Sequence, residues 1–183
     1  MLRVAMLACA LLGVPAGAQP QDFRSPDLQL RDQAEVLGDA AETELRERLA
    51  KVRRDSGLDF VIATTGDLGG KAADAFAWAI EAERMQVLPK IPRVVLVLSL
   101  DPAERTLAVV TTRPPRSGEI PGDPGVLETG SRELKALSEA LNNEVTPHLI
   151  IRDFEGAMKR AVDTVDTTVA AQVAKARPEG SGS

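Results

Sequence analysis

Hydrophobic and polar positions follow two different periods along the chain, which predict helices and strands in turn. Residues 39–57 are expected to form an amphipathic helix, because their apolar residues fall on one stripe at helical spacing: Ala41, Leu45, Leu49 and Val52. Residues 58–65 follow as a strand, and their run of consecutive apolar residues is typical of a strand buried on both faces. A glycine-rich turn over 66–70 leads into a second helix over 72–87.

The first helix carries signals for both of its ends. Asp39 is predicted to cap the N-terminus, with Glu42 three residues further on as in a capping box. Gly57 suits the position just past the C-terminus, where a left-handed backbone conformation is needed.

Two strands joined by a tight turn come next. Residues 94–98 are all apolar and mostly β-branched, which indicates a buried central strand. Asp101 and Pro102 form the turn, so residues 105–112 return as the hairpin partner.

Beyond the hairpin, the pattern indicates a loop and two helices. Residues 113–130 are rich in proline and glycine and are expected to form a long loop, and residues 131–145 are expected to be helical. Asp153 starts a last helix, whose apolar face is formed by Phe154, Ala157, Met158, Ala161, Val162, Val165 and Val169.

This order of elements predicts an α/β fold. A right-handed crossover through the second helix places the first two strands parallel, and the hairpin strand then makes the sheet mixed. Helices on both faces of one sheet give a single three-layer α/β/α sandwich.

The N-terminal residues follow the secretory pattern. Arg3 precedes an unbroken apolar run over residues 4–14, and Pro15 ends it before the small residues of 16–18. A run of about eleven residues is too short to cross roughly 30 Å of hydrocarbon, so residues 1–18 are interpreted as a signal peptide cleaved after Ala18.

Cleavage predicts a periplasmic or secreted protein. Residues 19–29 are then an extended leader, residues 30–177 the folded domain and residues 178–183 a disordered polar tail. No second apolar run approaches eighteen residues, so no membrane span is expected in the mature chain.

Composition excludes several classes of partner and chemistry. The only cysteine, Cys9, lies in the signal peptide, so the mature chain is expected to have no disulfide and no thiolate nucleophile. The chain has 27 acidic against 22 basic side chains, and this excess of negative charge disfavours binding to nucleic acid.

Three short motifs resemble those of a known family. Residues 30–37 resemble the opening motif of TPM domains, in which an aspartate corresponds to Asp32. Residues 68–70 with 76–77 are similar to a second family motif, and residues 145–149 with 153–156 to a third. The resemblance covers about residues 28–168, and it implies a periplasmic or lumenal domain associated with membrane machinery. Some members bind divalent cations through acidic loops, and a phosphatase activity is attributed to some.

The chain departs from the family pattern in two places. Pro92, Arg93 and Val94 occupy the position of an acidic motif that precedes the central strand in relatives. A proline- and glycine-rich loop replaces a short link, and residues 125–128 resemble a remnant of the motif that follows that link.

A site for Ca²⁺ or Mg²⁺ requires several oxygen ligands from different loops. The acidic residues at matching loops are the candidates: Asp32, Asp67, Asp74 and Glu128. The alternatives are that Asp67 orders its own turn and that Asp32 orders the approach to the first helix. Because Arg93 replaces an acid of the family motif, the favoured expectation is that no cofactor is bound.

The remaining candidates are a histidine and two aromatic residues. His148 is the only histidine, so it cannot form a conventional zinc site, and it is expected to be structural or exposed. Phe76 and Trp78 lie in a mostly apolar helix and are interpreted as core residues, with a protein-docking face as the alternative.

The favoured function is therefore that of a non-catalytic, exported module that binds another protein, in the periplasm or at a membrane surface. The alternative is a divalent-cation-dependent phosphatase of the TPM type, which would use the four acidic candidates. The sequence indicates no catalytic residues and no other cofactor-binding residues.

Overall fold

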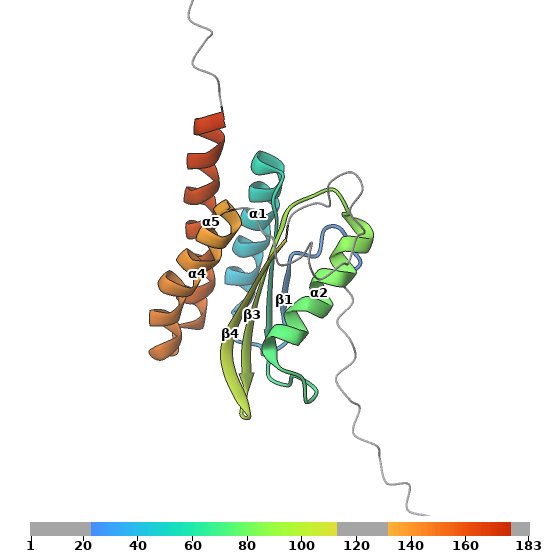
Figure 1. Cartoon of the computed structure of the whole chain (residues 1–183). Helices are drawn as coiled ribbons and strands as arrows, with labels where there is room; N and C mark the ends of the chain where they lie inside the picture. Colours follow the sequence, from blue (N-terminus) through green and yellow to red (C-terminus); the bar gives the residue numbers. More distant parts are fainter. Residues whose placement is uncertain (1–22, 113–131, 177–183) are drawn as a thin grey trace, which may run out of the picture.

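The computed structural model describes residues 23–112 and 132–176 of the chain. The predicted signal peptide, the loop with Glu128, and the C-terminal tail lie outside these residues. The elements run β1 (Leu30–Asp32), α1 (Asp39–Ser56), β2 (Asp59–Thr65), α2 (Ala73–Val87), β3 (Arg93–Asp101), β4 (Glu104–Thr112), α4 (Arg132–Ile150) and α5 (Phe154–Ala176) (Figure 1).

The sheet is mixed, as the sequence predicts. Its strand order is β1-β2-β3-β4, in which β1, β2 and β3 are parallel and β4 is antiparallel to β3. The short strand β1 is an addition to the predicted set, and Leu30 pairs in register with Ile62. The α/β prediction is confirmed.

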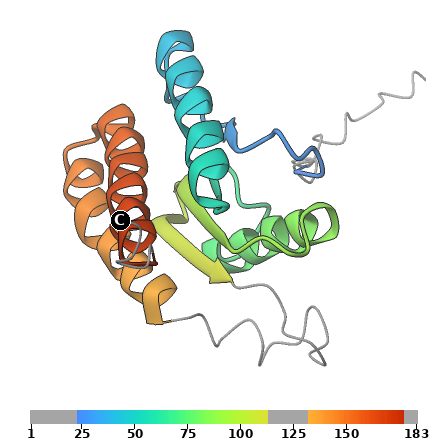
Figure 2. The same cartoon turned by 90° about the horizontal axis from the view of Figure 1, so that it is seen from above.

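Two apolar clusters lie on opposite faces of this sheet. The helices α1, α4 and α5 cover one face, and α2 covers the other (Figure 2). Successive residues of β2 alternate between the clusters: Phe60 and Ile62 face α1, whereas Val61 and Ala63 face α2. Because both faces of β2 and β3 are buried, their sequences do not alternate between apolar and polar residues.

The two ends of α1 differ in how well they match the predicted caps. Gly57 has a φ of 71° and donates its backbone N–H to the carbonyl of Arg53, which confirms the C-terminal prediction. The prediction that Asp39 caps the N-terminus is wrong. The extended residue Gly38 holds that position, with no side-chain cap, and Asp39 is already helical. The Glu42 carboxylate bonds Arg46 instead of closing a capping box.

The helix α4 is longer than predicted, since it continues past Val145 and ends at Ile150 with Pro147 inside it. A proline removes one helical hydrogen bond, here to the carbonyl of Asn143 on an exposed surface. Val145 is fully buried and Leu149 packs against the same core, and this packing offsets the loss.

The segment before β1 is fastened to the domain. Phe23 is fully buried on the α2 side of the sheet. The buried guanidinium of Arg84 donates to the carbonyls of Phe23, Ser25, Pro26 and Leu28, and its Nε and Nη2 donate to both oxygens of Asp59. Arg84 thus helps to hold residues 23–28 against α2 and β2, together with Arg53, which donates to the Pro26 carbonyl and to Asp27.

Within residues 23–112 and 132–176, no helix combines the length and apolar content needed to cross a bilayer.

Candidate functional site

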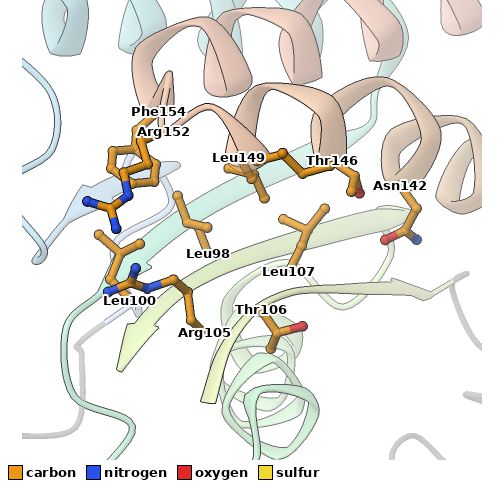
Figure 3. Close-up of a pocket in the computed structure, with 11 residues that line it drawn as sticks. Leu98, Leu100, Arg105, Thr106, Leu107, Asn142, Thr146, Leu149, Arg152 and Phe154 are labelled. Atoms are coloured by element: carbon orange, nitrogen blue, oxygen red, sulfur yellow. The ribbon is translucent and has the colours of Figure 1, made fainter. Parts of the chain in front are cut away.

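A pocket of about 550 Å³ opens between the hairpin end of the sheet and the corner that joins α4 to α5 (Figure 3). Six of its lining residues are apolar: Leu98, Leu100, Leu107, Leu149, Ile150 and Phe154. The others are polar or cationic: Arg105, Thr106, Asn142, Thr146 and Arg152.

Register and helical periodicity produce this lining. On the sheet, Leu98 pairs with Leu107 and Leu100 pairs with Arg105, so these four residues form adjacent cross-strand pairs. On α4, Asn142, Thr146, Leu149 and Ile150 recur at the spacing of one helical face. The pocket lies between this face of α4 and the sheet, where α4 does not completely cover β3 and β4.

Two arginines give the pocket a positive end. Figure 3 shows the guanidinium groups of Arg105 and Arg152 beside Leu100, at the same end of the pocket. In the part of the chain that the structure describes, neither group has a carboxylate partner. None of the described residues that line the pocket is acidic, although the whole chain has a net charge of −5.

The corner beside the pocket is unusual in backbone and in exposure. Arg152 has a φ of 60°, a left-handed conformation that costs a residue with a side chain about 1 kcal/mol or more. Ile150 and Ile151, immediately before it, are 77% and 73% exposed. Two adjacent exposed isoleucines at the rim of a pocket mark a surface suited to binding an apolar group.

Three of the four predicted metal ligands lie in the described residues, and they do not form a metal-binding group there. Asp32 accepts hydrogen bonds from the backbone N–H of Leu37 (2.7 Å) and from the Thr64 hydroxyl, so it orders the path from β1 into α1. Asp67 accepts from the backbone N–H of Gly69 (2.7 Å) within its own turn. Asp74 is exposed in the first turn of α2, and Glu128 lies outside the described residues.

No group of three or more histidine, cysteine or acidic side chains in residues 23–112 and 132–176 has a metal-binding arrangement. The cation site therefore stays a prediction. Two acidic residues outside the predicted ligand set, Asp101 and Glu104, bind the backbone of the loop before α2. Asp101 accepts from the backbone N–H groups of Leu68 and Ala103, which lower its carboxyl pKa in that order, and Glu104 accepts from the N–H of Ala73.

A family model described as the TPM domain matches residues 30–168. This chain belongs to the TPM domain family.

Two solved structures have the fold of this TPM domain. The N-terminal domain of a protein from P. gingivalis has a TM-score of 0.64 and 18% identity, over 84% of this chain and 90% of that one. The N-terminal domain of a protein from Corynebacterium glutamicum has a TM-score of 0.51 and 15% identity, over 98% of this chain and 95% of that one. No curated protein matches the chain.

Arg93 is one of the three residues predicted to stand where relatives carry an acidic motif, and the structure shows its surroundings. Arg93 is buried, and its Nε donates to Glu81 Oε2 at 2.8 Å. Its Nη1 donates to the carbonyl of Leu88, and the other Glu81 oxygen accepts from the Thr112 hydroxyl. The Arg93 charge is thus neutralised within the core between α2, β3 and β4, so it does not form a cationic surface near a metal site.

The two aromatic candidates of the TPM domain lie on α2. Phe76 and Trp78 are partly buried and pack against the α2-side apolar cluster. Neither lines the pocket. The residues of α4 and β4 that line the pocket were not predicted from the sequence. Their local signal is the apolar pair Ile150-Ile151, shortly before the predicted start of α5 at Asp153.

His148 and Asp153 fasten the corner of the TPM domain beside the pocket. Because an ionised carboxylate only accepts, His148 Nδ1 donates to Asp153 Oδ2 at 2.9 Å. Asp153 Oδ1 accepts from the backbone N–H of Gly156, which confirms that Asp153 starts α5. The hydrogen bond from His148, followed by that from Gly156, lowers the pKa of the Asp153 carboxyl below its usual 3.8.

Replacing Asp153 with alanine is expected to lower the melting temperature at neutral pH by about 2–4 °C, because the α5 cap is lost. Asparagine, which also caps helices, should retain most of this stability. A carboxyl whose pKa is depressed in the folded state stabilises the fold above its unfolded pKa, and this contribution is lost as the pH falls through the folded value. Thermal melts should therefore show the wild type and Asp153→Asn converging below pH 3.8. A constant difference across pH would contradict this role.

Proposed function

We propose that this TPM domain is a non-catalytic protein-interaction module that works outside the cytoplasm, in the periplasm or after secretion, and that it docks its partner through the pocket at the α4–α5 corner. The observation that carries the proposal is the combination, at one place, of an apolar floor, two cations without described partners and two exposed isoleucines. Apolar and arginine side chains are the groups that dominate protein interfaces.

The acidic residues support a module without catalysis. Asp32 and Asp67 accept hydrogen bonds from backbone N–H groups, which supports structural roles for these carboxylates. At the position of the family's acidic motif, Arg93 is committed to Glu81 inside the core. The oxygen ligands that a hard cation needs would have to come from elsewhere in the chain.

Site-specific photocrosslinking in the organism that makes the chain tests the proposal. A photoreactive residue at Asn142, which is exposed and lines the pocket, is expected to capture a protein. The matched control is Asn143, which is also exposed but is not among the lining residues of the pocket. The adduct at Asn142 should disappear when Arg105 and Arg152 are both changed to glutamate. Equal capture at both positions, or none at Asn142, would contradict the proposal.

Recovery of the mature protein from the same cells tests the proposed location. Its mass is expected to correspond to a chain that begins at Gln19, because the signal peptide is cut after Ala18. A cytoplasmic chain that retains residues 1–18 would disprove export.

The competing proposal is a divalent-cation-dependent phosphatase, and the two arginines of the pocket favour it because guanidinium groups bind phosphate. Hydrolysis of p-nitrophenyl phosphate that requires Ca²⁺ or Mg²⁺, and that stops with chelator, would support this alternative. A rise in melting temperature with either cation would point the same way.

A further inference from the structure

We infer that the pocket binds the C-terminal end of an extended partner polypeptide, with its terminal carboxylate between Arg105 and Arg152 and the last apolar side chain on Leu100, Leu107 and Phe154. This inference rests on the proposed function and specifies its ligand.

The first step is the strand edge that leads to the pocket. In residues 23–112 and 132–176, β4 pairs only with β3, so its outer edge has no strand partner. No other backbone hydrogen bond in the described part of the chain reaches residues 104–112. An extended peptide can add to such an edge through main-chain hydrogen bonds and place alternate side chains in adjacent pockets. A lipid acyl chain cannot form hydrogen bonds with these backbone groups.

The second step is the position of charge relative to the apolar floor. Arg105 is the direct cross-strand partner of Leu100, so a cation lies immediately beside an apolar side chain. Figure 3 shows Arg152 approaching the same place from the α4–α5 corner. The complementary ligand carries a carboxylate and an apolar side chain within one residue of each other.

A C-terminal residue satisfies this requirement, because its carboxylate and its side chain are on the same α-carbon. An internal aspartate or glutamate does not, because in an extended chain its neighbours point to the opposite face. Two arginines around one carboxylate provide the paired N–H donors that a planar carboxylate accepts. A pocket of about 550 Å³ has room for one bulky side chain and the chain end.

Two pools of acetylated hexapeptides test the inference on the mature chain from Gln19. Both have the last three positions randomised, and one ends in a free carboxylate whereas the other is amidated. The free-carboxylate pool is expected to be enriched in leucine, isoleucine, valine or phenylalanine at the last position. Amidation of the best peptide should weaken binding at least tenfold. Backbone amide NMR shifts on binding should map to β4 and to the α4–α5 corner.

Substitutions and competitors complete the test. Arg105→Gln and Arg152→Gln should each weaken binding about tenfold, because each removes one charge-assisted hydrogen bond. Arg54→Gln, at an exposed position on α1, is the matched control and should change nothing. All three variants should melt like the wild type. Methylation of the peptide backbone nitrogen that faces β4 should also abolish binding.

Several outcomes overturn the inference. If the amidated peptide binds equally well, the terminal carboxylate is not recognised. If the NMR shifts map away from β4, the peptide does not bind at the proposed site. Binding of laurate in place of any peptide would identify an acyl chain as the occupant, and peptide-free dimerisation through the pocket would identify a second copy. If the Asn142 crosslink persists while every peptide fails, the interaction module stands and only the C-terminal ligand is wrong. If both fail, both proposals fall.

Discussion

Replacing Arg84 with methionine is expected to lower the free energy of unfolding by about 3–5 kcal/mol, because it leaves a buried carboxylate without its partner. Arg84 and Asp59 are both fully buried, and their two hydrogen bonds are 2.8 and 2.7 Å long. Arg53 is 3.9 Å from Asp59 and partly exposed, so it replaces only a fraction of this interaction. Urea denaturation followed by circular dichroism measures the loss.

An exposed arginine provides the comparison. Arg46 pairs with Glu42 on the surface of α1, so Arg46→Met should change the stability by less than about 1 kcal/mol. Adding Asp59→Asn to Arg84→Met removes the stranded charge and should recover part of the loss. If Arg84→Met and Arg46→Met are equally stable, the buried pair does not hold the fold.

The same substitution has a local effect. Arg84 donates to four carbonyl groups between Phe23 and Leu28, so its loss should release this segment from α2. Hydrogen exchange at the Phe23 and Leu28 amides is expected to accelerate more than exchange within β3.

Changing Arg93 to aspartate, which restores an acid at the position of the family motif, is expected to cost about 3–5 kcal/mol or more. Glu81 would then face a second buried carboxylate instead of a guanidinium. Both side chains are almost inaccessible to water, so either one acid is protonated or the region opens. Urea titrations with and without millimolar Ca²⁺ or Mg²⁺ measure both the loss and any gain of cation binding.

Apolar replacement of the whole cluster is the control for this variant. Glu81→Leu, Arg93→Leu and Thr112→Val together remove every polar side-chain partner, and the triple variant should be far more stable than Arg93→Asp alone. Should Arg93→Asp remain stable and become stabilised by Ca²⁺ or Mg²⁺, the acid is tolerated and the non-catalytic proposal is in doubt.

Periodicity was sufficient to predict the main helices and strands because each has a regular apolar pattern. The short strand β1 was not predicted, since only Leu30 of its three residues is apolar. Its pairing also depends on Ile62, over thirty positions away. The predicted end of α4 near Val145 was wrong. The proline at 147 favours an earlier stop, whereas contact of Leu149 with the core favours continuing the helix.

The buried ion pairs have a signal in the sequence of α2. Glu81 and Arg84 fall on the same helical stripe as Ala73, Ala77 and Ile80, so two charged residues occupy the apolar face of α2. Their partners, Asp59 and Arg93, are at the starts of β2 and β3, and only the fold brings them together. Charged residues on a core-facing stripe therefore predict buried partners, although not their identity.

The pocket could not be predicted from the sequence. Its sheet side depends on the hairpin register that places Leu98 opposite Leu107 and Leu100 opposite Arg105, and its helix side on how α4 crosses that surface. Local pattern determines which residues face one way on each element. It does not determine where two such faces fail to cover each other.

The strand order β1-β2-β3-β4 follows the order of synthesis, and this has a consequence for a chain that emerges N-terminus first. The sheet, α1 and α2 can assemble before the last third of the polypeptide appears, because every neighbouring strand is also the next in sequence. The α1 face nevertheless lacks Leu141, Met158 and Val162 until α4 and α5 arrive. A product truncated after β4 would present this uncovered apolar surface to other chains, so it should aggregate during biogenesis.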